Sequence, residues 1–127
     1  MTQNLCRIIG IALILVGLAG FAMPHLLGMH LTTVHNVVHL LTGLIATYLG
    51  FAGSPGAART FCLVFGAVYL LLGVAGFLAP GLVSQVLGHP PVSARELTAD
   101  NLVHVVLGGV LLAAALMAPK AIVVKTT

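Results

Sequence analysis

The sequence GLAGFAMP at residues 17–24 returns as GVAGFLAP at residues 73–80, and this repetition decides the predicted fold. A second stretch, HNVVHLLTG at residues 35–43, lines up with DNLVHVVLG at residues 100–108. Repetition of this kind is typical of a duplicated supersecondary unit. We therefore expect a single domain made of repeat 1, about residues 1–55, and repeat 2, about residues 56–120.

The composition identifies lipid as the solvent. Hydrophobic residues make up 60% of the chain and charged residues only 6%, against roughly 25% charged in a soluble domain. Crossing a hydrocarbon core takes roughly 20 mostly apolar residues, and backbone groups in lipid must be satisfied within the segment, which favours helices. Four stretches qualify, at about residues 7–23, 33–53, 60–79 and 97–118. The predicted fold class is all-α, an integral membrane four-helix bundle of two tandem two-helix repeats with parallel pseudo-two-fold symmetry.

The basic residues predict the orientation, because Lys and Arg concentrate on the cytoplasmic side. One side of the predicted topology carries Arg7, Arg59, Lys120 and Lys125, and the other carries Arg95 alone. Both termini are therefore expected in the cytoplasm. Because these charges sit at helix ends, the formal net charge of +3 does not indicate a nucleic-acid partner. Cys6 and Cys62 are expected to be reduced packing residues on the same side.

Glycines recur at a helical spacing of two turns, so each pair lies on one helix face. Such faces let helix backbones approach closely in lipid, which predicts tight helix packing. The glycines concerned are Gly10, Gly17, Gly43, Gly50, Gly66, Gly73 and Gly108.

Local signals predict several helix ends. Pro24 and Pro80 are expected to end the first and third spans, since proline cannot continue the donor pattern. Thr32 or Thr33 can cap the second span. Ser93 and Glu96 have the spacing of a capping box at the start of the fourth.

Polar side chains gather at one end of the second and fourth spans. His35 and His39 share a helix face, and Glu96, Asp100 and His104 form a stripe with the same spacing. The repeat pairs His39 with His104, and Asn36 with Asn101. Three further histidines, His25, His30 and His89, fall in predicted loops, where we expect an interfacial role.

Three interpretations of this polar group compete. The simplest is a hydrogen-bonded network that fixes the helix register, including Asn36, Asn101 and Glu96. A second is a transition-metal site, with His35, His39, Asp100 and His104 as ligands. In the third, His39 or His104 is the axial ligand of a haem or a chlorophyll-type pigment. A carrier or sensor built on Glu96, Asp100 and His104 is a further alternative, but transporter sites lie nearer the midplane.

No catalytic constellation is recognisable in the sequence, so an enzyme is not expected. The small size and extreme apolarity favour a non-catalytic accessory or scaffold subunit, surrounded by lipid and by other membrane-protein subunits of a larger respiratory or photosynthetic complex.

The motifs Gly-x-x-Gly-Phe at residues 17–21, Leu26–Gly28 and His-Asn-x-x-His at residues 35–39 resemble an uncharacterised family of small four-span bacterial membrane proteins, a domain of unknown function. The resemblance covers nearly the whole chain. It implies a multi-pass protein of the bacterial inner (plasma) membrane and assigns no activity. The second copy departs from the motif, because Asp100 stands where a histidine would be.

Overall fold

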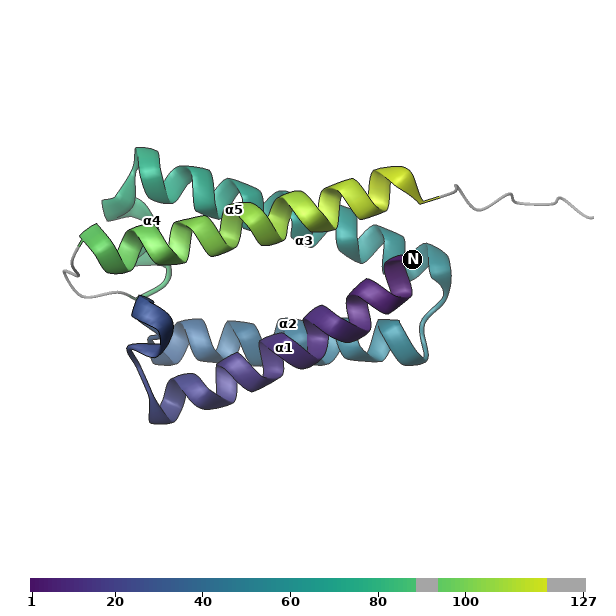
Figure 1. Cartoon of the computed structure of the whole chain (residues 1–127), viewed down its shortest axis with the longest axis horizontal. Helices are drawn as coiled ribbons and strands as arrows, with labels where there is room; N and C mark the ends of the chain where they lie inside the picture. Colours follow the sequence, from purple (N-terminus) through teal and green to yellow (C-terminus); the bar gives the residue numbers. More distant parts are fainter. Residues whose placement is uncertain (89–93, 119–127) are drawn as a thin grey trace, which may run out of the picture.

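The protein is built entirely of helices in the part of the chain that the structure describes. The computed structural model describes residues 1–88 and 94–118, except for the side chains of residues 94–96. The order of elements is α1 (Thr2–Ala22), the short 3-10 helix η1 (Leu26–Gly28), α2 (Thr33–Phe51), α3 (Pro55–Leu78), α4 (Pro80–Val86) and α5 (Ala94–Met117) (Figure 1).

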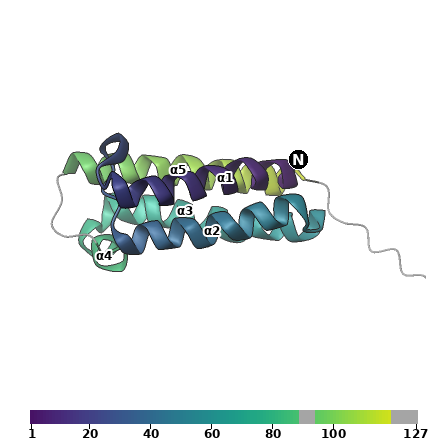
Figure 2. The same cartoon turned by 90° about the horizontal axis from the view of Figure 1, so that it is seen from below.

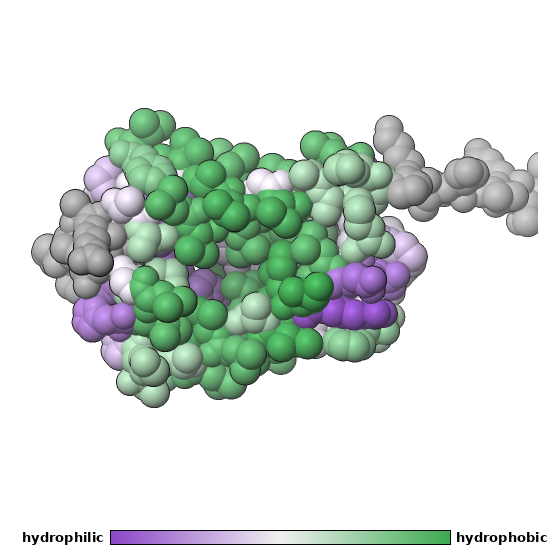
Figure 3. Space-filling model, in the orientation of Figure 1, coloured by the Kyte–Doolittle hydropathy of each residue, from purple (hydrophilic) through white to green (hydrophobic). Residues whose placement is uncertain are grey.

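Four of these helices are long and apolar enough to cross a membrane: α1, α2, α3 and the Leu97–Met117 part of α5. Figure 3 shows a broad hydrophobic belt, with hydrophilic residues gathered at the two ends of the molecule. Large apolar side chains such as Ile8, Leu71 and Leu116 point outward, as lipid contact requires. The predicted all-α class with four apolar helices is confirmed, and the protein is a multi-pass membrane protein.

The long helices are arranged as two pairs. In the first helix pair α1 lies along α2, and in the second helix pair α3 lies along α5, with far fewer contacts between the pairs (Figure 1). Seen from below, α1 and α5 form one layer, and α2 and α3 form the other (Figure 2). We call the end that carries η1 and α4 the loop end, and the opposite end, where the chain begins, the terminal end.

Glycines allow the backbones within each pair to touch. A Cβ added at Gly43 would lie 2.8 Å from the carbonyl oxygen of Gly10, and one added at Gly73 would lie 2.7 Å from the amide nitrogen of Val105. The same holds along both contacts, between α1 and α2 and between α3 and α5. The glycines that the structure places there are Gly10, Gly17, Gly43, Gly50, Gly66, Gly73 and Gly108.

The helix starts follow capping chemistry. The Thr32 hydroxyl accepts a hydrogen bond from the amide of His35 and caps α2. Ser54 caps α3 in the same way, and Pro55 occupies its first turn, so α3 begins earlier than the predicted start near residue 60. Helix α1 likewise begins earlier, at Thr2, and ends at Ala22 just before Pro24. The predicted capping box at Ser93 lies outside the described residues.

The loop end contains two short helices that the sequence analysis did not predict, η1 and α4. Pro80 begins α4 instead of only ending α3, because proline fits the first turn of a helix as well as the position after one. The connection through η1 turns sharply, with positive φ at Leu27 (55°) and Gly28 (79°). These segments cover the loop end of the long helices.

Two arginines lie at the terminal end and bind helix C-termini. The Nε of Arg7 donates to the carbonyl oxygen of Gly50 at 2.7 Å, and that of Arg59 donates to Ala115 at 2.9 Å. A cation stabilises the negative end of a helix dipole and satisfies an orphan carbonyl. Lys120 and Lys125, which were expected on the same side, lie outside the described residues.

Replacing Gly73 by alanine tests the close approach within a pair. We expect Gly73→Ala to lower the free energy of unfolding in detergent by about 1–3 kcal/mol, because the new Cβ meets backbone atoms of α5 that cannot move aside. Gly109→Ala is the matched control, since nothing lies within 4 Å of a Cβ there. Equal unfolding curves for the two variants would show that the Gly73 contact is not tight.

Candidate metal centre

Buried polar residues concentrate at the loop end of α2 and α5. Among the described residues, all of the buried polar ones except Thr2 lie on these two helices. They are His35, Asn36, His39, Thr42, Asp100, Asn101 and His104. Because α2 belongs to the first pair and α5 to the second, this polar region joins the two helix pairs.

Three of these residues bring imidazole rings together. Each of the residues His35, His39 and His104 has one ring nitrogen that lies within 4.8 Å of a ring nitrogen of the other two. The ring centroids of His35 and His39 are 4.3 Å apart, and the ring of His104 stacks on that of His35 at 5.6 Å. We call these three residues the histidine cluster.

A hydrogen bond fixes the tautomer of His104. Its Nδ1 lies 2.8 Å from the backbone carbonyl oxygen of Asp100. A carbonyl oxygen only accepts, so Nδ1 carries the hydrogen and donates it. In the neutral ring, Nε2 then keeps its lone pair. This arrangement, one ring nitrogen donating to a carbonyl and the other free to ligate, is the usual state of a metal-binding histidine.

The Asp100 carboxylate lies between the two pairs beside this cluster. Its two oxygens are each 3.8 Å from an Nδ1 atom, Oδ2 from that of His35 and Oδ1 from that of His104. Both distances exceed hydrogen-bond length. The carboxylate therefore faces the Nδ1 side of the rings and acts on them as a nearby negative charge. Asp100 was expected among the ligands, and this stays a prediction, since the three converging ligand atoms belong to His35, His39 and His104.

His39 has a buried ring nitrogen to satisfy. Its Nδ1 has no hydrogen-bond partner among the described residues. A buried polar atom without a partner costs roughly 1–3 kcal/mol, so such an atom requires an explanation. The ring of His39 lies 4.3 Å from that of His35, and an imidazole nitrogen in such surroundings is suited to a positively charged ligand.

Tyr69 completes the surroundings from α3. Its ring centroid lies 5.4 Å from that of His104. Tyr69 was not predicted from the sequence. The available signal was weak, since it is a tyrosine inside an otherwise apolar span of a chain with only two tyrosines and no tryptophan.

The two asparagines occupy matching places beside the cluster. The Asn36 side chain fills the space next to Gly20 on α1, and the Asn101 side chain fills the space next to Gly76 on α3. A Cβ at either glycine would collide with the amide. Each asparagine is thereby held against the partner helix of its own pair, which fixes the rotation of α2 and α5 and the direction in which their histidines point.

Thr32 links the end of α4 to the start of α2. Its hydroxyl donates to the carbonyl oxygen of Leu87 at 2.7 Å while accepting the capping hydrogen bond from the His35 amide. The backbone at His35 is thus anchored to the second half of the chain. Glu96, the remaining member of the predicted polar network, has a side chain outside the described residues.

An axial role of His39 or His104 toward a haem or a pigment stays a prediction. An apolar groove of about 530 Å³ runs between α1 and α5, and residues such as Ile9, Leu13, Val103 and Val106 line it. Neither His39 nor His104 contributes to its walls. A planar macrocycle needs an imidazole that opens onto such a space.

A double-mutant cycle tests whether the polar region joins the two pairs. We expect His35→Ala and Asp100→Ala to be coupled by about 0.5–2 kcal/mol in detergent unfolding with chelator present, the range seen for polar contacts between membrane helices. Tyr48→Ala combined with Asp100→Ala is the control, because Tyr48 is 66% exposed on the outer side of α2. Additive effects for His35 and Asp100 would contradict the contact.

The comparisons with known proteins place the chain in a family without assigning it an activity. Residues 3–117 match a family described as a domain of unknown function, DUF4383. No curated protein and no solved structure matches the chain. The match covers the four long helices and the histidine cluster almost completely. The resemblance to a domain of unknown function is borne out over most of the chain, and the protein belongs to the DUF4383 family.

Proposed function

We propose that this protein binds a divalent transition-metal ion, of the zinc type, in the histidine cluster where the two helix pairs meet. The observation that carries the proposal is the convergence of the His35, His39 and His104 nitrogens to within 4.8 Å of one another. All three side chains are buried, and two of them, His35 and His39, come from α2 of the first pair, while His104 comes from α5 of the second.

The distances fit a metal after a small adjustment. Zinc–nitrogen bonds of about 2.0–2.1 Å in tetrahedral geometry require nitrogens about 3.3 Å apart. Side-chain rotations that shift each ring nitrogen by about 1 Å would bring the three nitrogens to that separation. Three histidines leave a fourth position for water, and the Asp100 carboxylate supplies negative charge next to the rings without occupying that position.

A network of polar side chains alone explains the cluster less well. Imidazoles that satisfied each other would be joined by hydrogen bonds of about 3 Å, whereas the Nδ1 of His39 has no such partner among the described residues. A bound cation would satisfy this atom and would also balance the charge of Asp100.

Imidazole and carboxylate donors suit zinc, iron and copper, and thiolates would shift the preference toward softer ions. The two cysteines do not contribute, because Cys6 and Cys62 contact each other near the terminal end, with their Sγ atoms 3.7 Å apart. About fourteen helical residues separate Cys6 from Gly20, which lies beside the cluster end of α2, and this corresponds to roughly 20 Å. Nitrogen and oxygen donors suit zinc, and we take zinc as the test ion.

The orientation that we propose for the protein in the membrane is the one predicted from its basic residues. The positions of Arg7 and Arg59 at the terminal end support a cytoplasmic location for that end in a bacterial inner membrane. The loop end, with the cluster just inside it, then faces outward. The matched contacts of Asn36 with Gly20 and of Asn101 with Gly76 support an origin of the two pairs from one duplicated unit.

Metal binding is tested by titrating the chelator-treated protein in detergent with Zn²⁺ or Co²⁺. We expect one ion per chain, with a Co²⁺ absorption spectrum typical of nitrogen and oxygen ligands. His39→Ala and His104→Ala should each remove high-affinity binding, because each deletes a ligand. Asp100→Asn should weaken binding by about 10–100-fold, since it removes a charge next to the ligands but no ligand.

The matched control is Cys6→Ala combined with Cys62→Ala. It deletes the chain's only thiols, which are strong zinc ligands, yet should leave binding unchanged because they lie far from the cluster. Loss of binding in this control, or binding that persists in both histidine variants, would disprove the proposed site.

A second candidate function is that of an accessory subunit, and the apolar groove between α1 and α5 favours it. The groove walls are apolar throughout and open between the two pairs, so the side chains of a partner's membrane helix could fill them. Extraction from native membranes in a mild detergent tests this function. An accessory subunit migrates inside a large assembly, and Val106→Trp, which fills the groove, should release it. Migration as a single chain or a small homo-oligomer would argue against this function.

A further inference from the structure

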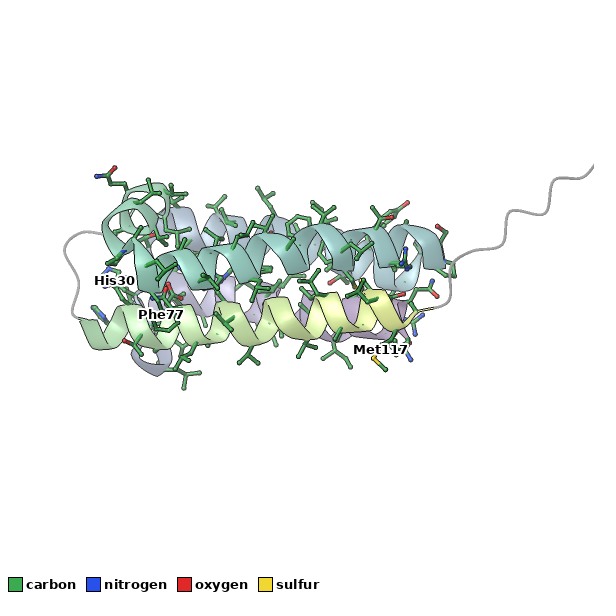
Figure 4. The ribbon with its side chains drawn as sticks, turned by 90° about the horizontal axis from the view of Figure 1, so that it is seen from above. His30, Phe77 and Met117 are labelled. Atoms are coloured by element: carbon green, nitrogen blue, oxygen red, sulfur yellow. The ribbon has the colours of Figure 1, made fainter. Side chains whose placement is uncertain are left out.

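Two more histidines lie outside the cluster at the same end of the molecule. His25 is exposed and His30 is half-buried, and their ring centroids are 4.8 Å apart in an edge-to-face arrangement. Figure 4 shows His30 at the loop end, near the start of α5 and at the opposite end from Met117. From the sequence, only an interfacial role was expected for these two residues.

The fold of the η1 segment brings these two rings together. The amide of Leu31 donates to the carbonyl oxygen of Pro24 at 2.7 Å, which closes residues 24–31 into a compact loop. The side chains of Met29 and Leu31 are buried and anchor the loop, and η1 contacts α5. His25 and His30 are thus held over the beginning of α5.

His30 connects the surface to the buried site. It lies near the start of α5, the helix that carries Asp100, and η1 contacts that helix (Figure 4). The carboxylate in turn lies 3.8 Å from the Nδ1 atoms of His35 and His104. Side chains able to bind a metal therefore follow one another from exposed His25 through His30 and Asp100 to the histidine cluster.

We propose that His25, His30 and Asp100 form an access route by which a divalent transition-metal ion passes from the aqueous side of the loop end to the histidine cluster. This inference rests on the proposed metal binding. A hydrated ion cannot reach the cluster through hydrocarbon, where a bare charge is too costly. Along this route each water that the ion loses is replaced by an imidazole or carboxylate, so the ion keeps ligands at every step.

An access route affects rates and leaves the equilibrium largely unchanged. His25 and His30 do not belong to the histidine cluster, so replacing them should not change the residues that finally bind the ion. Removing them should slow both loading and release. The loading rate should fall at least about tenfold, which is the lower end of the contribution of electrostatic steering to an association rate.

The test is stopped-flow loading of the chelator-treated full chain with Zn²⁺, followed by competition with a zinc indicator dye. We expect His30→Gln to slow loading at least about tenfold, with the Kd changed by less than a factor of about three, and His25→Gln to slow it less. Because His25 is exposed, its variant carries little risk of misfolding. Gln85→Ala, an exposed residue of α4 at the same end, should load like the wild type.

The outcomes separate this inference from the proposed function. Wild-type loading rates in both histidine variants would overturn the access route while leaving the metal site intact. A large loss of equilibrium affinity in His30→Gln would also overturn it, because His30 would then be a ligand. If the wild type itself binds no zinc, the proposed function fails.

Discussion

The backbone contact between paired helices is the constraint on which the rest of the structure depends. Lipid provides little hydrophobic driving force between helices, so α1 with α2 and α3 with α5 must gain their stability from close approach. Glycine supplies that approach wherever the helix backbones touch, as at Gly43 and Gly73. Near the loop end the same faces hold Asn36 and Asn101 in the spaces left by Gly20 and Gly76. Helix pairing therefore also sets the direction of the histidines.

Contact between the two pairs has a different character. Few backbone contacts join them, and their shared interior is apolar toward the terminal end, with Cys6, Cys62, Phe61 and Leu111 in its core. At the loop end the pairs meet through imidazoles and one carboxylate. Weakly joined halves with polar groups between them suit a site whose ligand completes the interface. A metal bound by His39 of one pair and His104 of the other would connect the two halves directly.

Much of this organisation could be predicted from sequence, because its signals are local or periodic. The length of the apolar stretches predicted the four spans, and the spacing of the glycines predicted the helix faces that touch within each pair. The repeated sequence related His39 to His104. The convergence of α2 with α5 was harder to predict, since it depends on how the two pairs sit against each other and no spacing encodes that. For the same reason Tyr69 was missed. The folding of η1 over α5, which places His30 near the start of that helix, depends on a turn with positive φ at Leu27, an unusual conformation for leucine.

X-ray absorption at the zinc edge, on protein loaded with one equivalent of Zn²⁺ in detergent, tests the central claim most directly. An ion bound in the histidine cluster should give a first shell of nitrogen and oxygen at about 2.0–2.1 Å, with outer-shell scattering from three imidazoles and no sulfur. A sulfur shell at about 2.3 Å would instead place the ion at Cys6 and Cys62. A shell of water oxygens without imidazole scattering would show that the histidine cluster does not bind the ion.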